Sequence, residues 1–417
     1  DAQESRGLGD VYKRQVYALK FSNTIDFSGS VPVFNYFESG SLIGVYGADY
    51  SGTDLLAIGN LEAGDRFGSS VSLDGLNLAV GAVGDDGFSN ALGDAGAVYL
   101  LNFADTNFGS PTLLGTLGSG YTGVPSDFSV GELDGANGFG ASVSLLNNRL
   151  AVGAPGDSGF SGGGLDRGAA FLFAFAGATL ESPTLEAVIG SGYIGSTALP
   201  VVGLYDGTRF GSAIALDTTR LIVGAAGDSG NGIGPSTGAA YLFSFAGPAF
   251  DNLELSGVMG GAYASGQTLS LTAQGINRSQ SENIGHAVSL DGQLLAIGSP
   301  FDNGASGLTA GAGAVYLISF SNAPGLNLTA PVLEGVIGSG YTGGKNLSVA
   351  GLQAGDNFGA SVSLFGSFLA VGAPGDDGGQ DDVADGGAVY TFAFQSGAFE
   401  NLSSFSTVGN GYGGVND

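Results

Sequence analysis

The chain of 417 residues repeats itself at intervals of about 72 residues, and this periodicity constrains its fold more than any other feature. A first block, Phe-Gly-Ser-Ser-Val-Ser-Leu at residues 67–73, is followed by Leu-Ala-Val-Gly-Ala at 78–82, Gly-Ala-Val-Tyr-Leu at 96–100 and Gly-Ser-Gly-Tyr at 118–121. The first block returns, with spacings of 72, 71, 74 and 74, at Phe139, Phe210, Ile284 and Phe358. The interval from the leading Phe or Ile of the first block to the Val or Ile of the second is 13 residues in all five copies, which indicates a tight connection between the two blocks.

Each block predicts a β-strand. The blocks are short apolar runs bounded by Gly, Asp, Asn or Pro, and they lack the apolar spacing of a helix. The first block alternates Ser with Val or Leu, which is typical of a half-buried strand, whereas the second is apolar on both sides and predicts a strand between two sheets. Close approach of neighbouring sheets explains the small residues Gly81 and Ala82.

Four strands per unit, in units that cannot bury both faces alone, predict an all-β fold: a β-propeller of four-stranded antiparallel blades with five full repeats and a half-repeat. The predicted partial repeat covers residues 16–66, and the full repeats cover 67–138, 139–209, 210–283, 284–357 and 358–417. Residues 1–15 break the pattern and have no apolar core, so they resemble a non-native leader and not a signal peptide. Because the sequence begins and ends within a repeat, we expect one propeller domain that is a fragment of a longer protein.

The composition narrows the classes of partner. A hydrophobic share of 43% is sufficient for a large core, and 38 acidic against 11 basic residues give a net charge of −27. An acidic chain without a basic patch disfavours nucleic acid and anionic membrane surfaces, and no apolar run approaches the roughly 20 residues of a membrane helix. The absence of Cys excludes disulfides and thiolate metal sites.

The succession of Phe-Gly-x-Ser-Val-Ser-Leu, Leu-Ala-Val-Gly-Ala-Pro-Gly-Asp and Gly-Ala-Val-Tyr resembles the FG-GAP repeat of the integrin α-subunit propeller. The name-giving Gly-Ala-Pro occurs at 153–155 and 372–374 and is degenerate in the other copies. The similarity is greatest to the bacterial versions in large secreted or surface adhesin-like proteins. The resemblance implies a ligand-binding propeller outside the cell or on its surface, with calcium in some blades.

Calcium is therefore the one candidate cofactor. The family's acidic loop lies between the first and second strands, but links such as residues 74–77 lack alternating Asp ligands, so that site is expected to be absent. The acids lie in the following loop instead, and paired carboxylates with Gly-rich carbonyls could supply the six to eight oxygens that calcium takes. The alternative, which the sequence favours, is a solvated turn in which Asp-Gly supplies the turn chemistry. The metal candidates, richest in the last repeat, are Asp85, Asp86, Asp94, Asp157, Asp166, Asp228, Asp302, Asp376, Asp377, Asp381, Asp382 and Asp385.

The sequence favours a binding and adhesion module that presents loops to a protein or glycan ligand. A structural subunit of a surface array or filament, associating through exposed edge strands, is the alternative. A hydrolase is disfavoured, and we expect no enzyme, because His286 is the only His and the Asp residues recur in every unit, unlike a single active site.

Overall fold

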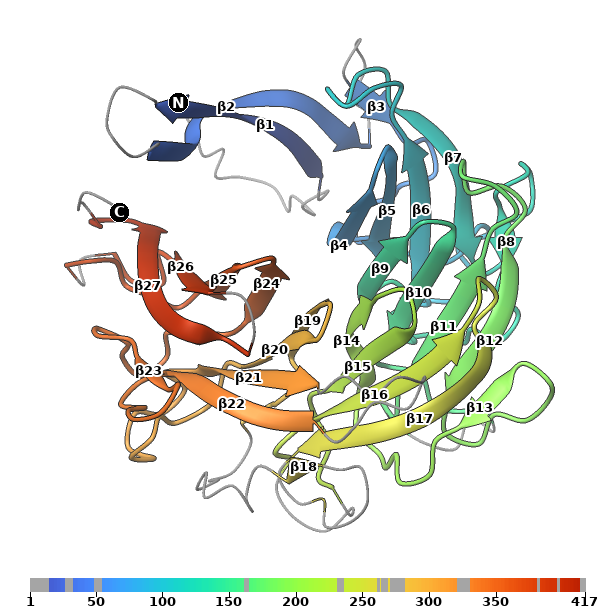
Figure 1. The fold of residues 1–417 in the computed structure, drawn as a ribbon. Coiled ribbons are helices and arrows are strands. Elements are labelled where there is room, and N and C mark those ends of the chain that lie inside the picture. Colours follow the sequence, from blue (N-terminus) through green and yellow to red (C-terminus); the bar gives the residue numbers. More distant parts are fainter. Residues whose placement is uncertain are drawn as a thin grey trace. The chain divides into compact units, whose positions relative to one another are not determined.

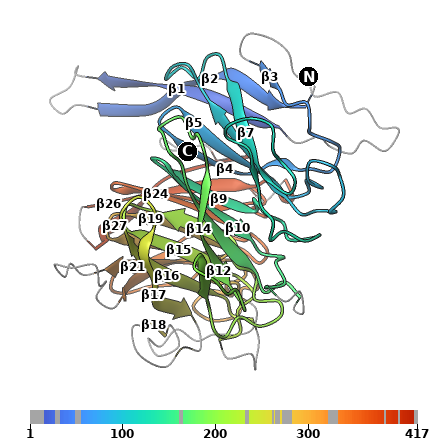
Figure 2. The ribbon, with the colours of Figure 1, turned by 90° about the vertical axis from the view of Figure 1, so that its right-hand side faces the viewer.

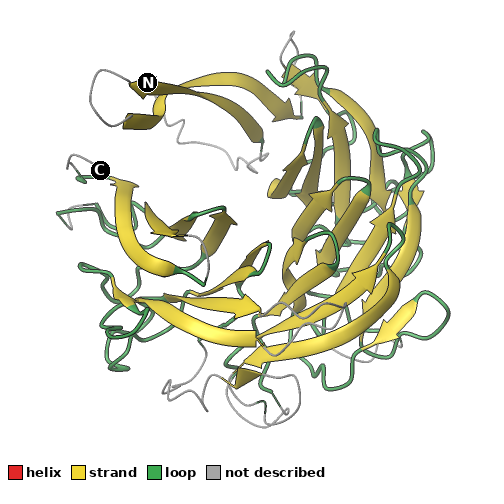
Figure 3. Cartoon of the chain, in the orientation of Figure 1, coloured by secondary structure: helices red, strands yellow, loops and turns green. Residues whose placement is uncertain are grey.

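The structure is a computed structural model that describes residues 15–26, 33–48, 55–160, 165–230, 236–260, 263, 269–270, 282–320, 331–380, 383–395 and 398–412. These residues form strands and turns and no helix (Figure 3), and none of them therefore forms a helix that is long and apolar enough to cross a membrane. The chain divides into two compact units, residues 1–140 with 176–183, and residues 141–175 with 184–417.

The second unit contains four sheets that follow one another in chain order (Figures 1 and 2). The first sheet comprises β9 (Ser142–Leu146), β10 (Arg149–Ala154), β11 (Ala169–Ala174), β12 (Thr184–Gly190) and β13 (Ala198–Pro200). The second comprises β14 (Phe210–Leu216), β15 (Arg220–Ala225), β16 (Ala239–Ala246), β17 (Asp251–Gly260) and β18 (Leu269–Ser270). The third comprises β19 (Ala287–Asp291), β20 (Leu294–Ser299), β21 (Ala314–Phe320), β22 (Pro331–Gly338) and β23 (Leu347–Ser348), and the fourth β24 (Ser361–Phe365), β25 (Phe368–Ala373), β26 (Ala388–Gln395) and β27 (Glu400–Gly409). The first strand of each later sheet packs on the sheet before it.

The first unit holds one sheet of the same kind and one of three strands. The former comprises β4 (Phe67–Asp74), β5 (Asn77–Ala82), β6 (Ala97–Asn102), β7 (Thr112–Gly118) and β8 (Phe128–Ser129). The latter comprises β1 (Val16–Asp26), β2 (Val33–Gly47) and β3 (Leu55–Ala57), and it holds the half-repeat. The predicted all-β propeller with five blade sheets of mainly antiparallel strands is thereby confirmed.

Four of the five blade sheets depart from the expected four strands at one edge, and the last, β24–β27, has four. In the first four blades a strand of two or three residues runs parallel to the fourth strand, as Val188 and Ile189 of β12 pair with Ala198 and Leu199 of β13. The chain returns along the outer edge after a loop, which a parallel pair requires. A strand this short shows no periodicity, so the sequence pattern did not reveal it.

The second strand of each repeat lies inside its sheet, between the first and the third strands. All residues of β5 and β10 are buried, as their apolar character on both sides predicts. The spacing between the first and second strands, which is the same in all five repeats, arises from a tight hairpin. In this hairpin Val152 pairs with Val143 and Arg149 with Leu146.

The Phe-Gly and Gly-Ala elements meet between successive repeats. A Cβ on Gly153 would lie 2.0 Å from the backbone oxygen of Gly211, so only Gly fits there. Gly211 itself has a φ of 90°, which favours Gly, and its oxygen accepts a hydrogen bond of 2.8 Å from the Ser142 hydroxyl. This confirms the close approach expected for the Gly-Ala pairs.

Candidate functional site

Five aspartates, one per full repeat, lie in the loop that follows the second strand, and all five are buried. Their exposed fractions are 1% or 2%, and the residues are Asp85, Asp157, Asp228, Asp302 and Asp376. They were predicted as metal ligands or as members of a solvated turn. Their burial means that other groups of the protein must satisfy each carboxylate.

Tyrosine hydroxyls donate hydrogen bonds to these carboxylates. Tyr99 donates to Asp85 over 2.7 Å and Tyr121 over 3.0 Å, while the Gly87 N–H donates over 2.8 Å. One tyrosine comes from the third strand and the other follows the fourth, so the cluster ties three parts of the repeat together. The same arrangement joins Tyr241 and Tyr263 to Asp228, Tyr316 and Tyr341 to Asp302, and Tyr390 and Tyr412 to Asp376.

The second repeat has a simpler version. Phe171 stands where the other repeats have the third-strand tyrosine, and Asp157 accepts from the Tyr193 hydroxyl over 2.8 Å and from the Gly159 N–H over 2.7 Å. The sequence analysis did not identify the hydrogen bonds of these tyrosines. The signal that could have found them is the recurrence, in four of the five full repeats, of a Tyr 13 or 14 residues after the Asp.

The electrostatics of the cluster keep the tyrosines protonated. Burial, together with the neighbouring Asp85 carboxylate, raises the pKa of Tyr99 and of Tyr121. Burial also raises the pKa of Asp85, although the hydrogen bonds from Tyr99, Gly87 and Tyr121 oppose this. Both hydroxyls therefore act as donors to Asp85 over the physiological pH range.

The other predicted acids shape the same loop. The carboxylate of Asp86 accepts from the Asp94 N–H over 2.7 Å, and that of Asp377 accepts from the Asp385 N–H over 2.8 Å. Asp94, Asp166 and Asp385 have φ values of 51–53°, in the left-handed region that Asp tolerates better than most residues. Asp381 and Asp382 lie outside the described residues.

The backbone carbonyls of Asp94 and Asp166 also accept hydrogen bonds from the next repeat. The Gly138 N–H donates to the Asp94 carbonyl over 3.1 Å, and the Arg209 N–H donates to the Asp166 carbonyl over 2.8 Å. The side chain of Arg209 forms an exposed ion pair of 3.7 Å with Asp166. The turns that contain Asp94 and Asp166 therefore contact the Phe-Gly segment of the following repeat.

The oxygen atoms of the buried aspartates are not arranged as the ligands of a calcium ion. The buried carboxylates accept from O–H and N–H donors, and calcium requires several converging oxygens with free lone pairs. Within the described ranges, no group of three or more Asp, Glu, His or Cys side chains is placed to hold a metal. The calcium prediction therefore stays a prediction, and no chemical step is derived from it.

A second buried acid precedes the Phe-Gly of two repeats, and the sequence analysis did not single it out. Asp65 is 6% exposed and Asp356 4%, and each accepts from a backbone N–H three residues earlier, that of Glu62 or Gln353. Burial, with the nearby Asp85 carboxylate, raises the pKa of Asp65 to about 6. Asn137 occupies the same place in the second full repeat, where its side-chain oxygen accepts from the Asp134 N–H.

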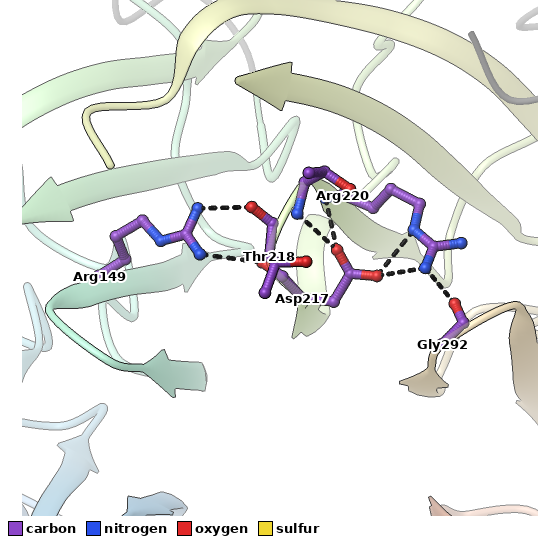
Figure 4. Close-up of polar contacts among 6 residues, drawn as sticks. Arg149, Asp217, Thr218, Arg220 and Gly292 are labelled. Atoms are coloured by element: carbon purple, nitrogen blue, oxygen red, sulfur yellow. Dashed lines mark hydrogen bonds and ion pairs between the residues drawn. The ribbon is translucent and has the colours of Figure 1, made fainter. Parts of the chain in front are cut away.

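Two arginines connect successive repeats at the opposite end of the strands (Figure 4). Arg149 begins β10 and donates to the Thr218 carbonyl over 2.9 Å, in the hairpin of the next repeat. Arg220 begins β15, donates to the Asp217 carboxylate over 2.7 Å and reaches the Gly292 carbonyl in the hairpin after that. This end of the sheets is thus occupied by contacts between repeats.

The end that carries the buried aspartates also carries the long loops. Antiparallel order places the connections after the second and the fourth strands at the same end of a sheet. Hydrogen bonds join them, as the Phe160 N–H donates to the Ser191 carbonyl over 3.3 Å. Large apolar side chains of these loops are exposed by 42–95%: Phe88, Val124, Phe160, Leu165, Ile194, Val202, Tyr205, Phe301, Leu308 and Val383.

Comparison with known proteins agrees with this architecture. The family described as FG-GAP repeat matches residues 53–101, 133–173, 205–243 and 347–392. The chain therefore carries FG-GAP repeats and is an FG-GAP β-propeller, which confirms the resemblance seen in the sequence. No curated protein matches the chain.

Among solved structures, one similar chain belongs to the structure titled "Complex of KlAtg21 with coiled-coil of AgAtg16". Its sequence is 10% identical, the alignment covers 91% of this chain and 76% of that one, and the TM-score is 0.41.

Proposed function

We propose that the chain is a binding and adhesion module that works outside the cell or on its surface and holds a protein or glycan ligand on its loops. FG-GAP propellers are often ligand-binding or adhesion modules, which supports the general class. The single observation that carries the proposal is the concentration of exposed apolar side chains in the loops at one end of the blade sheets. Exposed apolar groups on loops that a rigid scaffold positions are typical of binding surfaces.

The scaffold beneath these loops supports the same function. Each loop after a second strand is anchored by its buried aspartate, which accepts from a tyrosine on the third strand and from one that follows the fourth, or in the second full repeat from Tyr193. Anchored loops lose little conformational entropy on binding, which favours affinity. The chain has no catalytic role in this proposal, because the recurrent acids already act as hydrogen-bond acceptors within each repeat.

The test uses arrays of purified extracellular proteins and of glycans, probed with the whole chain. For a ligand found in this way, the variant Phe160→Ser, Leu165→Ser, Ile194→Ser is expected to lose most of the affinity, because these residues lie in the loops of the second full repeat. The matched control, Leu255→Ser with Val332→Ser, changes side chains that are 43% and 48% exposed on fourth strands, and it should bind normally. Equal loss in both variants, or no ligand on either array, would contradict the proposal.

A structural subunit of a surface array or filament is the second candidate. The observation that favours it is an exposed sheet face in the last repeat, where Val389 is 44% exposed. Size-exclusion chromatography and negative-stain images separate the two candidates. A uniform monomer of 41.1 kDa counts against an array, and concentration-dependent filaments support it.

A further inference from the structure

One junction between repeats differs from the others in its surface. The loop after the second strand of the second full repeat lies beside the segment that leads into the Phe-Gly of the third, and both belong to the second unit. The Gly207 N–H donates to the Leu165 carbonyl over 2.7 Å, and the Arg209 N–H donates to the Asp166 carbonyl over 2.8 Å. These backbone bonds hold the two segments side by side.

The same backbone bonds occur where the first two and the last two full repeats meet. A backbone N–H donates to the Gly93 carbonyl over 2.7 Å at the first of these junctions, and to the Ala310 carbonyl over 3.0 Å at the second. The N–H groups of Gly138 and Asn357 donate to the carbonyl of the residue after Gly93 or Ala310, over 3.1 Å and 3.0 Å. The shared bonds allow the three junctions to be compared position by position.

A third shared bond extends this match along the loop after the fourth strand. In each of the three repeats a valine N–H donates to the carbonyl of the last residue of that strand, over 2.9–3.1 Å. At four matched positions the other two junctions have small or polar residues where this junction has a large apolar residue or Arg. The matched residues are Leu165 with Gly93 and Ala310, Val202 with Gly131 and Ala350, Tyr205 with Asp134 and Gln353, and Arg209 with Gly138 and Asn357.

The four side chains that distinguish this junction are exposed to solvent. Leu165 is 74% exposed, Val202 95% and Tyr205 47%, and the Arg209 side chain is 61% exposed. Because the other junctions form the same backbone bonds without such side chains, the packing of the repeats does not require them. Large apolar side chains that gather on a surface without a role in folding are typical of interaction sites.

The Arg209 guanidinium has donors available for a partner. Among the described residues its one ion-pair partner is the Asp166 carboxylate at 3.7 Å, which is itself 49% exposed. An exposed ion pair at this distance contributes little to stability, and a guanidinium carries five N–H donors. A carboxylate from a partner can therefore accept two parallel hydrogen bonds from Arg209, which are stronger than the ion pair that they replace.

We propose that the junction surface, formed by Leu165, Val202, Tyr205 and Arg209, binds a protein segment that carries a carboxylate beside large apolar side chains. The carboxylate pairs with Arg209, and the apolar side chains cover the other three residues. Tyr and Arg around an apolar centre often dominate the binding energy of protein interfaces. Leu165 and Val202 favour a protein over a glycan, because sugar hydroxyls pressed against them would lose hydrogen bonds to water. The inference rests on the proposed function and names the partner class for this part of the loops.

The probe is a phage-displayed library of random dodecapeptides, selected against the immobilised whole chain. Enriched peptides are expected to carry Asp or Glu next to Leu, Ile or Phe. They are then synthesised with a fluorescent label, and their affinity for the chain in solution is measured by fluorescence anisotropy. The variants Arg209→Asn and Leu165→Ala, which introduce the residues of the last junction, should each weaken binding at least about tenfold.

A matched control uses the same substitution at the same position of another repeat. Arg209→Asn is compatible with the fold, because Arg209 has a φ of 54° and Asn357, its counterpart, one of 55°. The control is Arg66→Asn, before the Phe-Gly of the first full repeat, where φ is 56°. Gly59 and Glu62 stand there in place of the apolar residues. This control should bind normally, and both Asn variants should melt within a few degrees of the parent.

Enriched peptides that lack an acid overturn the proposal, as does binding that Arg209→Asn leaves unchanged or that Arg66→Asn weakens equally. A selection without any enriched peptide also overturns it. If the glycan array of the proposed function then yields a ligand, that function stands with a glycan as its occupant. If neither the protein array nor the glycan array yields a ligand, both proposals fail.

Discussion

At the residue scale, the recurrent acids hold each repeat together through hydrogen bonds to tyrosine. Asp228 accepts from both Tyr241 and Tyr263, whereas Asp157 accepts from Tyr193 and has Phe171 at the position of the third-strand tyrosine. A buried carboxylate that loses a donor pays the cost of desolvation without compensation. The two clusters, which lie in the same unit, therefore predict unequal effects of the same substitution.

We expect Tyr193→Phe to lower the free energy of unfolding by about 2–3 kcal/mol, the range for breaking a hydrogen bond to a buried charged group. Tyr263→Phe should cost less, about 1 kcal/mol, because Tyr241 continues to donate to Asp228. Urea denaturation of the second unit, followed by tyrosine fluorescence and circular dichroism, measures both. Equal costs would contradict the assigned roles.

A second prediction at this scale concerns pH. The folded-state pKa of Asp65 is raised from 3.8 to about 6, so its contribution to stability is present at low pH and is lost as the pH rises through about 6. Asp65→Asn keeps the side-chain acceptor for the Glu62 N–H, as Asn137 does for its own repeat. After a discount for partial solvent screening, this variant should be about 1–2 kcal/mol more stable than the parent at pH 8 and nearly equal at pH 4.

Denaturation of the first unit at the two pH values provides the measurement. The reverse change, Asn137→Asp, serves as the matched variant and should introduce a loss of stability above pH 6. A difference between Asp65→Asn and the parent that is the same at both pH values would show that the charge of Asp65 is not responsible.

At the element scale, the Phe-Gly and Gly-Ala segments form the junction between successive sheets. The sequence predicted the strands, their hairpin spacing and the need for small residues at the junction, because these features repeat at fixed intervals. It did not predict which carbonyl fills the space above Gly153, since that oxygen belongs to Gly211, 58 residues later in the chain and in another repeat. Nor did it predict β13 or β18, whose two or three residues are too few to show a period.

The junction predicts a strong contrast between two identical substitutions. Gly153→Ala places a methyl group 2.0 Å from the Gly211 oxygen, so one sheet must shift, and we expect a loss of more than about 3 kcal/mol. Gly372→Ala meets no backbone of another repeat and should cost less than about 1 kcal/mol. Thermal melts of the two variants beside the parent decide the matter, and similar losses would refute the role given to the junction.

At the scale of the whole molecule, one repeat design is used five times with local exceptions. The resemblance to FG-GAP repeats identified the propeller class, and the acids of the candidate site were found by their recurrence. Their chemistry was not predictable, because burial and tyrosine contact arise from residues on three different strands or loops of a repeat. Most of the exposed apolar side chains of the loops lie at positions that vary between repeats, so the repeat pattern does not mark them; Phe88 and Phe160, each three residues after the buried Asp, are an exception.

The most direct test of the structural role of the acids is a thermal melt of the whole chain in millimolar calcium and again in excess chelator. A ligand that binds only the folded state raises the melting midpoint by mass action. Because the buried carboxylates already accept hydrogen bonds from Tyr and backbone donors, we predict coincident cooperative melts under both conditions. A rise of several degrees with calcium would contradict this account and would make the loops of Asp85, Asp157, Asp228, Asp302 and Asp376 metal sites.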